Sequence, residues 1–157
     1  MCLYTSQSKP KVTSEPIRCI KMVRKRKDGS YLPYFCFTCQ STIYRIGEVT
    51  SMHCDENKID PDYLKTDKEL FEIPEKCCKG YNRYFVERGI FTFNPNNSEW
   101  KAAYHHAVLR NSTTVLLECE IPAGVKYYAG KSNCLFGEKS YASESIKVIR
   151  EISIDNL

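Results

Sequence analysis

The last third of the chain carries the sequence feature that most constrains its fold. An apolar run from Thr113 to Glu118 leads into Ile121-Pro122-Ala123-Gly124, and aromatic and β-branched segments follow up to residue 149. Proline fixes φ and removes a ladder donor, whereas glycine tolerates φ > 0, so this Pro-x-Gly step predicts a tight turn after a strand. The segment order therefore predicts a sheet in which a loop lies between two buried strands, a common place for a binding site.

Length and composition indicate one globular domain. At 157 residues, the chain is long enough to bury a core, and we expect residues 17–157 to form it after an irregular arm over residues 1–16. No apolar run approaches the ~20 residues of a membrane span. The start of the chain lacks a signal-peptide pattern, so the nine cysteines are expected as reduced thiols in a cytoplasm, that of the host if the chain is phage-encoded.

Local signals place several further elements. Asp28-Gly29 predicts a hairpin between a strand from Ile17 and a strand from Tyr31, and Gly89 is expected to break a strand region over residues 81–93. Ser98 is a good N-cap for a helix over residues 99–109. One face of that helix is apolar, with Trp100, Ala103, Tyr104, Ala107 and Val108. We predict an α+β fold that is rich in β-structure, with mostly antiparallel sheet and one helix at about 99–109.

The motifs that could carry metal or catalytic chemistry are incomplete. Cys36 and Cys39 have CxxC spacing, but within a strand they would point to opposite faces, so no metal site is predicted. His105 and His106 are adjacent on the predicted helix and cannot face one site, which favours a solvent position for both. The net charge of +4 is mild, and the basic run from residue 21 to residue 27 ends at a hairpin tip, so nucleic acid is not expected as a partner.

Several segments resemble a group of uncharacterised small proteins from gut bacteria and their phages. This resemblance covers most of the chain and implies no activity. In that group the segment beginning at Gly89 commonly reads Gly-Phe-His-Ser-Phe, and here Phe91 stands in place of the histidine. The matching segments are Met1-Cys2-Leu3-Tyr4, Cys19-Ile20-Lys21-Met22, Pro33-Tyr34 with Phe37, Gly89-Ile90-Phe91-Thr92-Phe93, and Cys119 to Gly130 together with Tyr141-Ala142-Ser143.

A second set of residues resembles the ADP-ribosyltransferase fold. Arg18, Thr92, the turn at residues 121–124 and Glu144 occur in the order of the arginine, the Ser/Thr strand, the turn and the glutamate of those enzymes. The resemblance implies NAD as cofactor, with Arg18 on a phosphate of the dinucleotide and Glu144 as the catalytic residue. The chain departs from the family pattern in two places. It lacks the Ser-Thr-Ser triplet of the family, and Ile146 stands in place of the second glutamate of the family's Glu-x-Glu pair.

We therefore expect a non-enzymatic accessory protein of phage or mobile-element type that binds a nucleotide-like small molecule or a host protein. The alternatives are an active or degenerate transferase of the kind just described and a virion-associated structural protein. The predicted ligand-binding residues are Arg18, Lys126, Tyr128 and Tyr141, because aromatic rings stack on bases and cations pair with phosphates. The sequence leaves open whether Tyr128 faces the ligand or packs in the core with Tyr127 exposed. No cofactor is expected outside the transferase alternative.

Overall fold

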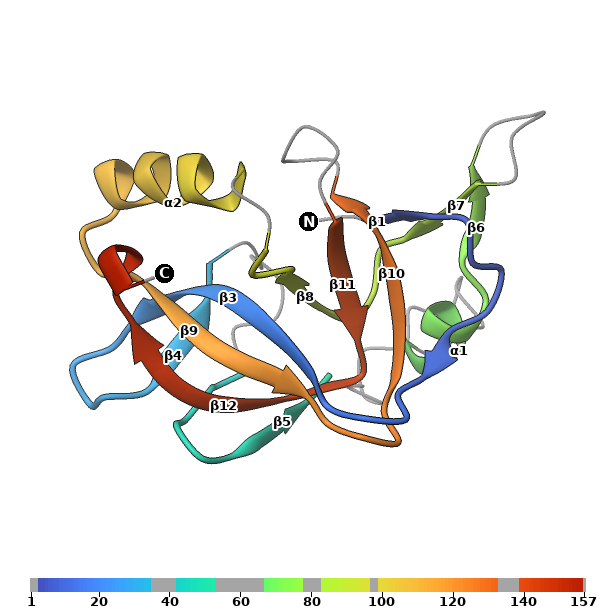
Figure 1. The fold of residues 1–157 in the computed structure, drawn as a ribbon, viewed down its shortest axis with the longest axis horizontal. Coiled ribbons are helices and arrows are strands. Elements are labelled where there is room, and N and C mark those ends of the chain that lie inside the picture. Colours follow the sequence, from blue (N-terminus) through green and yellow to red (C-terminus); the bar gives the residue numbers. More distant parts are fainter. Residues whose placement is uncertain are drawn as a thin grey trace, which may run out of the picture.

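The protein has an α+β fold dominated by one antiparallel sheet (Figure 1). The computed structural model describes residues 3–34, 42–52, 67–77, 83–96, 99–132 and 139–156. Within these residues every strand pairing is antiparallel, as predicted. The elements are β1 (Leu3–Thr5), β2 (Lys11–Val12), β3 (Ile17–Lys25), β4 (Tyr31–Pro33), β5 (Val49–Ser51), α1 (Asp67–Glu72), β6 (Glu75–Cys77), β7 (Arg83–Val86), β8 (Ile90–Phe93), α2 (Glu99–Arg110), β9 (Thr114–Ile121), β10 (Lys126–Ser132), β11 (Lys139–Ser143), β12 (Ser145–Ile152) and the 3-10 turn η2 (Ile154–Asn156).

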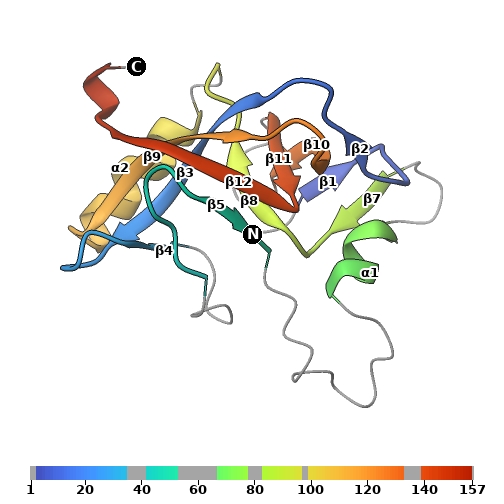
Figure 2. The same cartoon turned by 90° about the horizontal axis from the view of Figure 1, so that it is seen from below.

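The strand order divides the sheet into two halves. One half runs β5-β12-β9-β3, with β4 beside β3, and the other runs β8-β11-β10-β1-β7-β6, with β2 beside β10. Between the halves, β3 and β8 pair only at Ile20 and Phe93. The chain also crosses from one half to the other at Glu144, where β11 ends and β12 begins (Figure 2). The sheet is therefore continuous in hydrogen bonding but narrow at its centre.

Three apolar clusters fill the two sides of this sheet. Along β3, Cys19 and Val23 belong to the central cluster between the halves, while Ile20 and Met22 face the opposite side, as strand alternation requires. On that opposite side they pack with Trp100 of α2. The third cluster lies under α1 and contains Leu3, Phe71, Val86, Tyr128 and Ala142. Each helix thus covers the outward side of one half of the sheet (Figure 1).

Local chemistry explains the elements that the sequence predicted. The hairpin between β3 and β4 closes where Asp28 accepts hydrogen bonds from both the amide and the hydroxyl of Ser30, while Gly29 takes a φ of 82°. Gly89, with a φ of 123°, separates β7 from β8. The predicted helix is confirmed as α2, and its Trp100 is only 1% exposed.

The structure corrects the prediction for the start of the chain. Residues 1–16 were expected to form an irregular arm, yet β1 inserts between β10 and β7 and buries Leu3 completely. The backbones of β1 and β10 lie so close together that residue 130 must be glycine. A Cβ there would lie 2.1 Å from the Tyr4 carbonyl oxygen. A three-residue strand has too little alternation to be recognised in a sequence, and here long-range pairing decides its structure.

The Pro-x-Gly turn does not join two paired strands. Gly124 has a φ of 80°, and its amide donates to the Thr13 carbonyl, while the Thr13 hydroxyl donates to the Pro122 carbonyl. Beyond this turn β10 leaves β9 and pairs with β11, β1 and β2 instead. The turn therefore connects β9 in one half of the sheet to β10 in the other half.

Candidate functional site

Arg18 lies on the outward side of the sheet in an ion cluster. Its Nε contacts Glu118 Oε1 at 2.5 Å, and Arg150 Nε contacts Glu118 Oε2 at 2.5 Å. The Glu118 side chain is only 12% exposed, and its hydrogen bonds to Arg150 and Arg18 hold the pKa of the carboxyl below its usual value. This arrangement links β3, β9 and β12. The Nε of Arg18 is bound to Glu118 and is therefore not available to a ligand.

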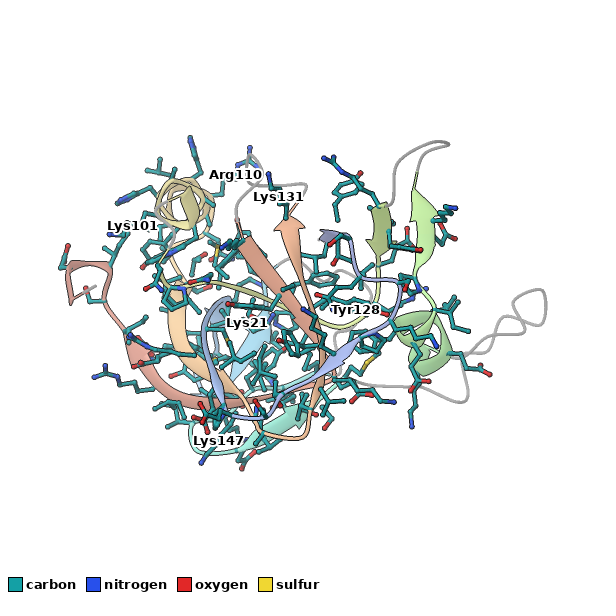
Figure 3. The ribbon with its side chains drawn as sticks, turned by 45° about the vertical axis from the view of Figure 1, so that its right-hand side comes forward. Lys21, Lys101, Arg110, Tyr128, Lys131 and Lys147 are labelled. Carbon is teal, nitrogen blue, oxygen red and sulfur yellow. The ribbon has the colours of Figure 1, made fainter. Side chains whose placement is uncertain are left out.

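Tyr128 belongs to the core, so the structure selects the alternative in which this ring is not presented to a ligand. It is fully buried, its ring meets Phe71 edge-on at 5.1 Å, and its hydroxyl donates to the Phe71 carbonyl at 2.6 Å. Figure 3 shows Tyr128 among packed side chains beside α1. Lys126, on the same side of β10, pairs with Glu72 at the end of α1, and this contact raises the lysine pKa. Both residues therefore anchor α1 to the sheet.

Tyr141 lies on the other side of the same half-sheet. It packs half-buried against the central cluster, 6.3 Å from the Tyr127 ring, and accepts a hydrogen bond from Asn94 Nδ2 at 3.1 Å. Burial raises its pKa, which keeps the phenol neutral. Arg18, Lys126 and Tyr141 thus point to different sides of the molecule, and the four predicted ligand-binding residues do not converge.

The residues named by the transferase resemblance are also dispersed. Thr92 is fully buried beside Cys19, whose pKa burial raises to about 12. Glu144 occupies the bend between β11 and β12, where its carboxylate accepts a hydrogen bond from the Lys126 amide. Arg18 is held by Glu118 on the outward side of β3.

A different set of side chains does share one face, at the far end of the β10–β11 pair. Strand register places Phe85 of β7 opposite Tyr4 of β1, Tyr4 opposite Lys131 of β10, and Lys131 opposite Lys139 of β11. Directly opposed residues of antiparallel strands point to the same side, so these four form a transverse row. We call it the aromatic–basic row. Glu75 of β6, opposite Phe85, continues it to the sheet edge.

The geometry of the aromatic–basic row leaves it accessible. Tyr4 and Phe85 are half-buried with ring centroids 5.2 Å apart, whereas both lysines are exposed. Lys131 and Lys139 are directly opposite each other, so two positive charges lie side by side on this face. Lys131 forms no ion pair with any residue that the structure describes. Figure 3 shows it at the end of β10.

Local sequence patterns do not predict this row, because strand register brings its members together from distant segments. Tyr4 lay in the expected arm, and Phe85 lay in a strand whose partners could not be assigned. The one local signal was the alternation Tyr127-x-Ala129-x-Lys131, which puts these three on one face of β10. With Tyr128 placed in the core, that alternation selects Lys131 over Lys126.

Comparison of the chain with protein-family models, with curated proteins and with solved structures finds no match. Among the described residues no helix is long and apolar enough to cross a membrane. The same residues contain no group of three His, Cys, Asp or Glu side chains that could hold a metal ion. The expectation for Cys36 and Cys39 falls outside the described residues, whereas His105 and His106 are exposed on α2, as predicted.

Proposed function

We propose that this chain is a binding protein for nucleotide-like ligands and that the aromatic–basic row is its site. The observation that carries the proposal is the register that places two aromatic rings in tilted contact beside two exposed lysines on one sheet face. Aromatic rings on a sheet surface stack on bases, and lysine ammonium groups pair with phosphates. An accessory role in a phage or mobile element is supported by the sequence resemblance alone.

The order of the row sets the orientation of the ligand. Neighbouring strands lie about 4.8 Å apart, so a base stacked on Tyr4 and Phe85 would have its phosphate one or two strands away, at Lys131 and Lys139. The Glu75 carboxylate lies in the same row beyond Phe85, at the end away from the two lysines. There it can accept a hydrogen bond from an exocyclic amino group of the base. The site therefore favours cytidine nucleotides over uridine nucleotides, which have a carbonyl at the same position.

The experiment is isothermal titration of the protein with cytidine and uridine monophosphates, supported by thermal shift. We expect cytidine monophosphate to bind more tightly, and Lys131→Ala to weaken it about five- to tenfold by removing one charge-assisted contact that solvent screens. Tyr4→Leu should weaken both ligands by removing the stacking surface.

Lys76→Ala is the matched control, because Lys76 is exposed on the neighbouring residue of β6 and points to the other side of the sheet from Glu75. Equal losses in Lys76→Ala and Lys131→Ala would show that only net charge matters. Absence of binding by either nucleotide at millimolar concentration would overturn the proposal and favour a host protein as the partner.

A further inference from the structure

The face that carries the aromatic–basic row continues along β10 toward the centre of the molecule. Lys131, Ala129 and Tyr127 alternate along the strand, so all three point to the side of the sheet on which Tyr4 and Phe85 lie. On β11, Tyr141 is opposite Ala129 and joins the same face. The aromatic–basic row is therefore the first part of a longer surface.

A second aromatic pair with its own cation lies on this continuation. The Tyr127 and Tyr141 rings meet edge-to-face at 6.3 Å, and both remain partly exposed. Lys11 of β2 is directly opposite Tyr127, is exposed, and makes no ion pair with a described residue. Read along β10, the face therefore repeats the combination of an aromatic pair and an adjacent lysine.

The spacing of the two pairs exceeds what one nucleotide can cover. Tyr127 lies four residues from Lys131, which is opposite Tyr4, and four residues of strand span about 13 Å. A single stacked base touches side chains on neighbouring strands about 5 Å apart, so it contacts one aromatic pair only. Between the pairs lies Ala129, whose small side chain is exposed and does not block the surface. The side-chain amide of Gln7 lies beside it, and its oxygen accepts a hydrogen bond from the Ala129 backbone amide at 2.8 Å.

We infer that this face takes a single-stranded nucleic acid, with one base on each aromatic pair and phosphates at Lys131 and Lys11. Positively charged tracks interrupted by aromatic side chains are how proteins hold single strands, since every base has a face that can stack. The mild net charge of the whole chain argued against nucleic acid, but three exposed lysines, Lys11, Lys131 and Lys139, share this face. The inference rests on the proposed function, because it extends the same site from one nucleotide to at least two.

The test is fluorescence anisotropy with fluorescein-labelled hexacytidylate and hexadeoxycytidylate, compared with titration of cytidine monophosphate. We expect either hexamer to bind at least tenfold more tightly than the mononucleotide, because a second base adds its own stacking contact. The logarithm of the binding constant should fall with the logarithm of salt concentration with a slope of about −1.4 for two phosphate contacts on a single strand.

Lys11→Ala separates this inference from the proposed function. It should weaken hexamer binding about fivefold and leave mononucleotide binding unchanged, while Lys131→Ala should weaken both. Tyr127→Leu keeps an apolar side chain toward the central cluster and should also weaken only the hexamers; circular dichroism checks that it folds. Lys76→Ala remains the control for charge.

Four results distinguish the longer site from the mononucleotide site. A hexamer that binds no better than cytidine monophosphate, or a Lys11→Ala variant with unchanged hexamer affinity, would overturn the inference while the mononucleotide site stands. Absence of binding by all three ligands would overturn both. Binding of either hexamer at least tenfold more tightly than cytidine monophosphate would support the inference. The hexamer with the higher affinity, ribose or deoxyribose, would then identify the class of nucleic acid.

Discussion

Replacing Glu118 by glutamine tests whether the Arg18–Glu118–Arg150 cluster stabilises the sheet. The carboxylate is mostly buried at 12% exposure, whereas the two arginine side chains are 54% and 65% exposed. Hydrogen bonds to charged groups contribute about 1.5–3 kcal/mol when buried, but exposed ion pairs contribute only about 0.2–1 kcal/mol. Glutamine keeps one oxygen acceptor and loses the charge, so we expect a loss of about 1–2 kcal/mol in the free energy of unfolding.

The assay is urea unfolding followed by the fluorescence of Trp100, the single tryptophan of the chain. Glu120→Gln is the matched control on the same strand. The Glu120 carboxylate is 3.9 Å from Lys147, and its side chain is 31% exposed, compared with 12% for Glu118. That variant should lose less than about 0.5 kcal/mol. Equal losses in the two variants would refute the view that burial of the Glu118 carboxylate makes its pairing matter.

The pH dependence gives an independent check on Glu118. Its pKa in the folded protein is lowered by hydrogen bonds to Arg150 and Arg18, so folding favours the charged carboxylate. The resulting stability is present above the unfolded pKa of about 4.3 and is lost as the pH falls through the lower folded pKa. The difference between the wild type and Glu118→Gln should therefore be largest near neutral pH and shrink in acid. A difference that stays constant down to the acid limit would contradict this account.

Further predictions concern packing, backbone geometry and thiols. Trp100→Ala should cost about 3–5 kcal/mol in urea unfolding followed by circular dichroism, while Leu109→Ala, at a position that is 84% exposed on the same helix, should cost little. Gly89→Ala should destabilise more than Gly47→Ala in the same assay, because both have positive φ but only a Cβ at Gly89 would approach the Phe71 ring, at 2.9 Å; similar losses would contradict the steric argument. Cys19 and Cys119, which are buried with raised pKa values, should resist a thiol reagent at pH 8 until urea unfolds the protein; rapid reaction in the folded state would show that the core opens.

The sequence predicted the elements whose structure is decided locally. The hairpin at Asp28-Gly29 depends on a turn that these two residues form themselves, and the helix from Glu99 depends on an apolar stripe of helical period. In both cases the signal and the structure lie within a dozen residues. The β-rich antiparallel fold followed from the same kind of local pattern.

The candidate site was not predictable in the same way. Tyr127 and Tyr128 are adjacent, and strand alternation alone cannot say which of them is buried. The structure decides this through α1, whose Phe71 carbonyl accepts the Tyr128 hydroxyl hydrogen bond from 57 residues away. Once Tyr128 is buried, Lys126 turns toward Glu72, and the exposed face of the strand belongs to Lys131.

The insertion of β1 into the sheet has a consequence for synthesis on the ribosome. Thr5 donates a hydrogen bond to the Ala129 carbonyl across 124 residues of sequence, and Arg18 reaches Glu118 across 100. Before the last quarter of the chain emerges, β1 and β3 lack these partners, and they can pair only in part, β1 with β7 and β3 with β4 and with Phe93 of β8. Pairings of such high contact order form slowly, so the nascent chain has unpaired strand edges for most of translation. Expression at reduced temperature or with a holdase chaperone should therefore raise the soluble yield more than any single stabilising substitution.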